Sequence, residues 1–197
     1  MNKILKLILH PEIIRKKIEW AYYKKRFNSI GKNSSIGNDI SIVGERYITI
    51  GNNFAAGKSV SLWAWKTNED NTPQMIIKDN VGINDFCAIS CANKVEIGSD
   101  CLFGTNAFVT DNFHGKNDTL DELKISPMKR EIFYKGEVII GNNVWLGRNV
   151  CVMPNVKIGD GAIIGANSVV THDIPEYCVA VGSPAKVVKR ITDTKEK

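Results

Sequence analysis

Residues 140–170 read IGNNVWLGRNVCVMPNVKIGDGAIIGANSVV. An aliphatic side chain recurs there at every sixth position without a slip, at Ile140, Leu146, Val152, Ile158, Ile164 and Val170. A period of six fits neither the 3.6-residue period of an α-helix nor the period of two of an ordinary strand. It fits short strands joined by tight turns, with the leading aliphatic pointing inward. Three such strands predict a triangular coil of about 18 residues, and stacked coils bury a continuous aliphatic column.

Small, turn-forming residues follow the leading aliphatics. Gly comes directly after four of them, at Gly141, Gly147, Gly159 and Gly165. Because Gly and Asn tolerate a positive φ better than other residues, we expect both to form the corners between strands. The same count continues back to residue 30 and predicts about six coils. The upstream leading aliphatics are Ile30, Ile36, Ile42, Ile50, Ala56, Leu62, Ile77, Ile83, Ile89, Ile97, Phe103 and Val109.

The pattern predicts one all-β solenoid domain with two appendages. An N-terminal basic helical segment covers residues 1–27, the coils cover 28–174, and an extension expected to pack as strand and helix covers 175–197. The coil pattern is interrupted by insertions at 63–76 and 110–139. Insertions in repeat proteins emerge as surface loops and often build the binding face.

Basic residues are concentrated at the N-terminus. Residues 1–27 hold eight Lys or Arg against two Glu, so with a chain total of +5 the remainder sums to −1. A basic excess this local argues against a nucleic-acid-binding body. Ile14 and Ile18 fall at helical spacing, and we expect a helix that caps the end of the coil stack. A second interpretation, compatible with the first, is an interfacial helix resting on anionic lipid.

The five cysteines show no C-x-x-C spacing, and we interpret them as buried, reduced thiols of a cytoplasmic protein. No secretory signal is evident, because the apolar run at 4–9 is broken by Lys6 and lacks a small-residue cleavage site. That run is also too short to span a bilayer.

The hexapeptide run and its continuation THDIPEYCVAVGSPAKVVKRI, residues 171–191, resemble the hexapeptide-repeat acyltransferases. The similarity covers residues 30–191 and is nearest in character to the O-acetyltransferases of bacterial surface polysaccharides, with galactoside and maltose acetyltransferases as relatives. It implies a left-handed parallel β-helix, acetyl-CoA as co-substrate, no required metal, and a homotrimer with active sites between subunits. The left-handed sense comes from the resemblance alone, since general chirality rules favour right-handed connections.

His114, in VTDNFHG, follows the inward Val109 where the chain leaves the coil. In the resembled family, a His at this place is the general base. A sugar hydroxyl attacks a thioester only if its proton is removed as the bond forms, and a neutral imidazole with a pKa of about 6.5 suits that task. Asp111 is expected either to hold the second ring nitrogen of His114 or to cap a turn.

The resemblance also assigns residues to the acetyl-CoA donor. They are Gly147, Arg148, Ala166, Thr171, His172, Lys186 and Lys189. Relatives have a Thr-Lys pair touching the donor where this chain has Thr171 and His172, so His172 departs from the pattern. The two lysines match basic positions near the nucleotide phosphates. The alternative for them is a solvated basic end.

The acceptor site is assigned from the resemblance and from position near the insertions. The expected substrate-binding residues are Ser90, Asn93, Asn84 and Trp145. Trp63 and Trp65 could stack on sugar rings, or they pack at a trimer seam or under the loop. For Trp145 the alternatives are the acyl pocket and the seam.

These observations predict an acetyl-CoA-dependent O-acetyltransferase that acts on a sugar hydroxyl of a bacterial surface glycan, in the cytoplasm or at the inner membrane face. Two alternatives stay open: an amino-sugar N-acetyltransferase on the same fold, and a scaffold that catalyses nothing. Acetylation of a virginiamycin-type antibiotic is a further acceptor possibility, disfavoured by the basic N-terminal segment. A γ-carbonic anhydrase-like enzyme is rejected, because its zinc needs three His ligands and the chain has three His in all, with His10 in the leading helix.

Overall fold

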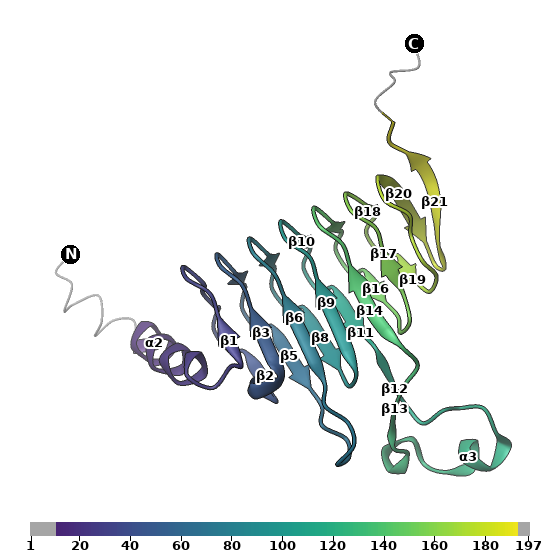
Figure 1. Cartoon of the computed structure of the whole chain (residues 1–197), viewed down its shortest axis with the longest axis horizontal. Helices are drawn as coiled ribbons and strands as arrows, with labels where there is room; N and C mark the ends of the chain where they lie inside the picture. Colours follow the sequence, from purple (N-terminus) through teal and green to yellow (C-terminus); the bar gives the residue numbers. More distant parts are fainter. Residues whose placement is uncertain (1–10, 193–197) are drawn as a thin grey trace.

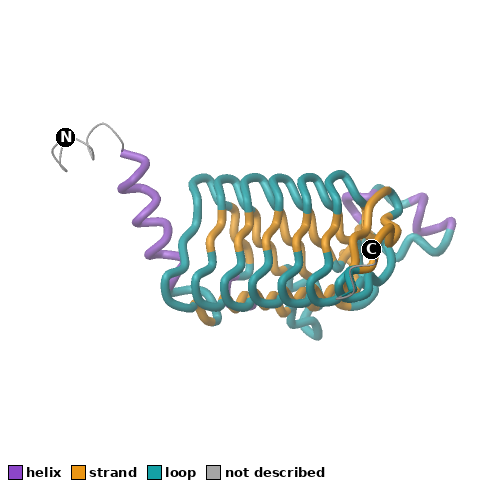
Figure 2. The backbone as a smooth tube through the Cα atoms, turned by 90° about the horizontal axis from the view of Figure 1, so that it is seen from above, coloured by secondary structure: helices purple, strands orange, loops and turns teal. Residues whose placement is uncertain are grey.

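The structure is a computed structural model and describes residues 11–192. The chain passes through three parallel β-sheets in turn and so builds one elongated stack (Figure 1, Figure 2). Sheet 1 contains β1 (Ser29–Ile30), β3 (Ile48–Ile50), β6 (Gln74–Ile77), β9 (Lys94–Ile97), β14 (Glu137–Ile140) and β17 (Lys157–Ile158). Sheet 2 contains β4 (Ala55–Ala56), β7 (Gly82–Ile83), β10 (Leu102–Phe103), β15 (Trp145–Leu146), β18 (Ile163–Ile164), β20 (Cys178–Gly182) and β21 (Ala185–Arg190). Sheet 3 contains β2 (Ser41–Val43), β5 (Ser61–Ala64), β8 (Ala88–Cys91), β11 (Phe108–Thr110), β16 (Cys151–Val152) and β19 (Val169–Val170).

The predicted leading aliphatics occupy equivalent register positions in all three sheets. Ile97 pairs with Ile140 in sheet 1, Phe103 with Leu146 in sheet 2, and Val109 with Val152 in sheet 3. These six side chains are at most 1% exposed. The inward aliphatic column is therefore confirmed, and only its first members, Ile30, Ile42 and Ala56, are partly exposed.

The corners differ from the sequence prediction in one respect. The Gly that follows a leading aliphatic does not carry the positive φ. The residue two positions later does, and it is most often Asn, as at Asn149 (57°) and Asn167 (59°). Gly147 is needed instead because neighbouring turns of the chain approach closely. A Cβ added there would lie 2.7 Å from the backbone nitrogen of Ala166. The corner asparagines also bond along the stack, since the Asn149 amide donates to Asn167 Oδ1 at 2.8 Å.

Two appendages stand outside the stack. Helix α2 (Pro11–Lys24) projects from its N-terminal end, and residues 1–10 lie outside the described chain (Figure 2). Of the α2 side chains that the structure describes, Trp20 and Tyr23, near the end of the helix, pack against the core. At the other end, β20 and β21 form an antiparallel hairpin. The expectation of a helix in the C-terminal extension is wrong for residues 175–192.

The interruptions of the coil pattern all lie between a strand of sheet 3 and the next strand of sheet 1, an edge called here the 3–1 edge. The first holds the short 3₁₀ helix η1 (Glu45–Tyr47). The second is shorter than predicted, because β5 and β6 leave only residues 65–73 between them. The longest forms an ordered arm (Figure 1). That arm contains β12 (Asn112–His114), α3 (Leu120–Lys124), η2 (Pro127–Lys129) and β13 (Ile132–Tyr134), with β12 and β13 paired antiparallel.

Candidate functional site

His114 ends β12, at the base of the long arm, directly opposite Ile132 of β13. The ring is exposed and lies in the wall of a cleft of about 700 Å³. Within residues 11–192, neither nitrogen of this ring makes a hydrogen bond, so both are open to a ligand. The cleft is lined by Trp63, Trp65, Ser90, Phe108, Thr110, Asn112, Phe113, His114, Asn117, Arg130, Ile132 and Met153.

A short hydrogen-bond chain fixes the polar floor of the cleft. The Trp65 indole donates from Nε1 to Ser90 Oγ at 3.1 Å, and the Asn112 side-chain amide donates to the same oxygen at 3.0 Å. Trp63 lies beside Trp65, with ring centroids 6.0 Å apart, and its own Nε1 donates to Ser41 Oγ. The two indoles are thus held in place before any ligand binds, which favours binding because less side-chain motion is lost.

Asp111 does not hold the His114 ring in this structure. Its carboxylate is fully buried and accepts hydrogen bonds from the backbone N–H groups of Ala92 (2.7 Å) and Asn93 (2.8 Å). The Asn112 amide donates a third bond to it, at 2.9 Å. Of the two roles expected for Asp111, the structure thus provides the turn-fixing one, and it acts on the turn that follows Ser90.

Arg130 and Glu122 hold the arm above the cleft. The Arg130 guanidinium donates to Asn117 Oδ1 at 2.7 Å and to the carbonyls of Leu123 and Ile125. The Glu122 carboxylate accepts hydrogen bonds from the backbone N–H groups of Lys116 and Asn117, just after β12, at 2.7 Å each. Desolvation acts the other way, but these donors keep the pKa of Glu122 below its usual value. The arm is therefore a folded element that positions Asn117 and Arg130 in the cleft wall.

The residues predicted to bind the donor fall into three separate groups. Gly147, Arg148 and Ala166 share the corner between sheets 2 and 3, whereas Lys186 and Lys189 lie on β21 at the end of sheet 2. Thr171 and His172 are on the 3–1 edge, the edge that also carries His114. The β20–β21 hairpin adjoins the first group, because the Gly182 N–H donates to Ser168 Oγ at 3.0 Å and Val181 pairs with Lys186. Thr171 and His172 lie at a different corner of the coil.

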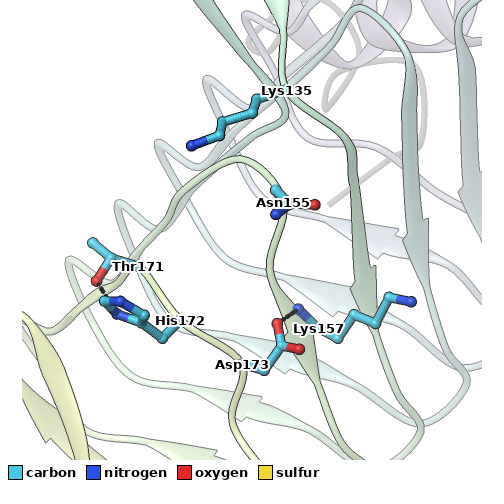
Figure 3. Close-up of a pocket in the computed structure, with 6 residues that line it drawn as sticks. All are labelled: Lys135, Asn155, Lys157, Thr171, His172 and Asp173. Atoms are coloured by element: carbon cyan, nitrogen blue, oxygen red, sulfur yellow. Dashed lines mark hydrogen bonds between the residues drawn. The ribbon is translucent and has the colours of Figure 1, made fainter.

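The Thr171 and His172 group lines a polar cavity of about 750 Å³ together with Lys135, Asn155, Lys157 and Asp173 (Figure 3). Thr171 Oγ1 and His172 Nδ1 are 2.8 Å apart and hydrogen-bonded. Lys157 contributes mainly its backbone, which donates to Asp173 Oδ1 at 2.8 Å, while its side chain extends away from His172 toward Glu137 (Figure 3). The Lys135 ammonium group and the His172 imidazole therefore face this cavity.

Of Ser90, Asn93, Asn84 and Trp145, Ser90 alone lines the His114 cleft, together with Trp63 and Trp65, the two tryptophans that could stack on sugar rings. Asn93 follows on the same edge, but its amide donates to the Gly136 carbonyl and fixes the return of the arm. Asn84 is an exposed corner residue after β7, and Trp145 is half exposed on the outer face of sheet 2. Neither shares a described cavity with His114.

Sequence reasoning did not assign Asn112, Arg130 or Met153 to this site. A usable signal was present, since each interruption follows the third leading aliphatic of its triplet, at Ile42, Leu62, Ile89 and Val109. That spacing alone places the insertions on one edge of a triangular coil. Across residues 11–192, no group of three or more His, Cys, Asp or Glu side chains is arranged to hold a metal ion. No helix in that range is both long and apolar enough to cross a membrane.

Comparisons with known proteins agree with this architecture. The family described as "Bacterial transferase hexapeptide (six repeats)" matches residues 137–172. The chain is 38% identical over 146 residues to the putative lipopolysaccharide biosynthesis O-acetyl transferase WbbJ of Escherichia coli K12, which spans 73% of this chain and 71% of WbbJ. Among solved structures, a maltose O-acetyltransferase from Clostridium difficile 630 matches with a TM-score of 0.59 and 27% identity, over 90% of this chain and 76% of that one.

A second solved structure shares the fold at lower identity. It is AntD, an N-acyltransferase from Bacillus cereus in complex with dTDP and coenzyme A, with a TM-score of 0.72 and 23% identity over 87% of this chain and 89% of AntD. The repeat frame, the placement of His114 and the 38% identity to WbbJ lead to one conclusion. The chain belongs to the hexapeptide-repeat acyltransferases.

Proposed function

We propose that this protein is an O-acetyltransferase that moves an acetyl group from acetyl-CoA to a sugar hydroxyl of a bacterial surface glycan. The observation that carries the proposal is the open His114 ring in a cleft whose other wall is the anchored Trp63 and Trp65 pair. Aromatic faces suit the apolar faces of sugar rings, and Ser90 and Asn112 offer polar partners for hydroxyl groups. The similarity to WbbJ supports a glycan acceptor.

In the proposed reaction, His114 accepts the proton of the sugar hydroxyl as that oxygen bonds to the thioester carbon. The carbon–sulfur bond then breaks, and His114 returns the proton to the departing thiolate of CoA. One base thus serves both half-steps, and the acetyl group passes directly to the sugar. A general base of this kind contributes roughly 10²–10⁴-fold in rate.

The test is CoA thiol release in the presence of a panel of plain sugars and amino sugars. His114→Ala should lower kcat/KM by about 10²–10⁴-fold, with an unchanged melting temperature. Thr49→Val, on β3 of sheet 1 and outside the cleft, is the matched control and should behave as wild type. Near-normal turnover by His114→Ala would refute the mechanism. Transfer to amino sugars alone would favour the N-acetyltransferase alternative, and the absence of thiol release with every acceptor would favour the scaffold.

We further propose that the donor binds between subunits of a homotrimer with left-handed coils, about six per chain, as the family resemblance implies. This is supported by the placement of the predicted donor residues at two different corners of one chain, with Thr171 and His172 apart from the others. It is also supported by the apolar outer face of sheet 2, where Trp145 is 51% and Leu102 47% exposed. In a trimer, the corner at Gly147 of one subunit would face the 3–1 edge of its neighbour.

We also propose that helix α2 contacts anionic lipid at the inner membrane face. Helix α2 exposes Ile14, Ile18 and Tyr22, one turn apart, beside Arg15 and Lys17. An apolar stripe flanked by cations suits the surface of an anionic bilayer. We expect Ile18→Glu to lower co-sedimentation with phosphatidylglycerol vesicles at least fivefold. Ile125→Glu, which replaces a comparably exposed aliphatic in the arm, should not do so. Equal loss in both variants would contradict the idea.

A further inference from the structure

A second cavity adjoins the His114 cleft on the 3–1 edge. It measures about 300 Å³ and is lined by Trp65, Lys66, Thr67, Asn68, Glu131 and Ile132. Two of these residues, Trp65 and Ile132, also line the cleft. We propose that this cavity binds a second sugar ring of the acceptor, so that the substrate is an oligosaccharide or glycan chain rather than a monosaccharide. The inference rests on the proposed acetyl transfer.

Trp65 forms a fixed wall between the two cavities. Its indole nitrogen is tied to Ser90 in the cleft, and its backbone N–H donates to the Cys91 carbonyl at 2.7 Å. Ile132 is the direct strand partner of His114. The second cavity therefore begins beside the catalytic histidine. A ring placed there would be the immediate neighbour of the ring that presents its hydroxyl to His114.

The second cavity is lined in part by Thr67, a residue whose side-chain hydroxyl is buried and unpaired. Among the described residues, Thr67 Oγ1 is the one buried side-chain oxygen or nitrogen without a hydrogen-bond partner. The segment around it is well tied, since the Thr67 backbone N–H donates to Asn71 Oδ1 at 2.8 Å and the Asn71 amide donates to the Ala92 carbonyl. A buried hydroxyl left unpaired costs free energy, and in the proposed complex the Thr67 side chain rotates about χ1 so that this hydroxyl pairs with a ligand hydroxyl in the cavity.

The charge of the cavity fits a neutral sugar better than a phosphate. Lys66 brings one cation and Glu131 one anion, and Asn68 adds an uncharged amide. Lys66 is in addition partly neutralised by Glu69, 3.7 Å away. A nucleoside diphosphate would require an excess of cations. The cavity volume of about 300 Å³ lies at the small end of the range of ligand sites, which agrees with one sugar ring rather than an extended group.

The first experiment compares acceptors that differ by one ring. We would measure kcat/KM of the wild-type protein with glucose and maltose, galactose and lactose, and N-acetylglucosamine and N,N′-diacetylchitobiose. In the accepted series, the disaccharide should exceed the monosaccharide by about tenfold or more, because binding energy from a remote ring lowers the barrier. Equal values would overturn the second subsite and leave the acetyltransferase intact. Transfer to none of the six sugars would overturn both.

The second experiment removes the unpaired hydroxyl without changing the side-chain shape. Thr67→Val should raise KM for the disaccharide about fivefold to tenfold, so that the ratio of disaccharide to monosaccharide kcat/KM falls toward one. Its melting temperature should stay the same or rise, since no bond within the protein is lost. Thr49→Val, on sheet 1 and outside both cavities, is the isosteric control. An unchanged ratio in Thr67→Val, or a fall in both threonine variants alike, would contradict the proposal. Preference for UDP-glucose over maltose would assign the cavity to a nucleotide instead.

Discussion

The outer faces of sheet 1 and sheet 2 are built from the same repeat but carry opposite chemistry. Across sheet 1 runs a chain of ion pairs, from Lys78 to Glu96 (2.8 Å), to Lys94 (3.4 Å), to Glu137 (3.4 Å) and to Lys157 (3.7 Å). Such a chain crosses four strands and is stable in contact with water. Sheet 1 is therefore a solvent face.

Sheet 2 shows the contrary arrangement at equivalent positions. Its outward row, in strand register, is Ala55, Gly82, Leu102, Trp145, Ile163 and Val179, without a charge among them. Trp145 directly precedes the inward Leu146 in sheet 2, just as Ile139 directly precedes the inward Ile140 in sheet 1. Contiguous exposed apolar rows commonly mark protein interfaces. The comparison teaches that the inward column forms the coil, while the outward side chains of each sheet, taken together, decide what that face contacts.

The strongest test of this contrast places a charge on the apolar row. Trp145→Lys should convert the proposed trimer to monomers, because three buried lysines without partners would be desolvated at the seams. Activity should fall at least 100-fold if the donor site lies between subunits. Light scattering coupled to size exclusion measures the first effect and thiol release the second.

Ile139→Lys is the matched control on sheet 1. The new cation would lie beside Glu96, its register partner, and the assembly should persist. A trimer that survives Trp145→Lys, or one lost in both variants, would break the distinction between the two faces.

A milder change tests the same row by size alone. Leu102→Ala should weaken assembly by about 1 kcal/mol per subunit, given about 0.8 kcal/mol per buried methylene. Over three seams, that lowers the trimer association constant by roughly two orders of magnitude. Ile76→Ala, on the outer face of sheet 1, should leave that constant unchanged. Sedimentation equilibrium at several protein concentrations distinguishes these outcomes.

The smallest effect is expected on the charged face. Hydrogen bonding to Lys78 lowers the pKa of Glu96 below its usual value of 4.5. The ionised Glu96 carboxylate therefore contributes stability that is fully present above about pH 4.5. This contribution is lost as the pH falls through the lower pKa that Glu96 has in the folded state. Glu96→Gln should cost about 0.5 kcal/mol at pH 7, and less in 1 M salt. Urea melts at pH 7 and pH 3 check this, since the difference between variant and wild type should shrink at the lower pH.

The sequence predicted the catalytic candidate but only part of its surroundings. His114 and Ser90 are in the cleft as expected, because each is a fixed number of residues from an inward aliphatic. Asp111 takes the second of its two predicted roles, since its carboxylate binds the neighbouring backbone instead of the His114 ring. Asn84 and Trp145 lie on other faces, where only a second subunit could bring them near His114.

The six-residue period by itself determined the parallel strands, the inward column and the corner at which His114 leaves the coil. These depend on local spacing, which a single repeat already contains. Only the tertiary structure decided which loops meet. Segment 65–73, the turn after Ser90 and the arm around Arg130 converge because stacking places every sheet 3 to sheet 1 corner on one edge. The unpaired Thr67 hydroxyl and the wall formed by Trp65 arise from that convergence, because they depend on contacts between residues far apart in the chain.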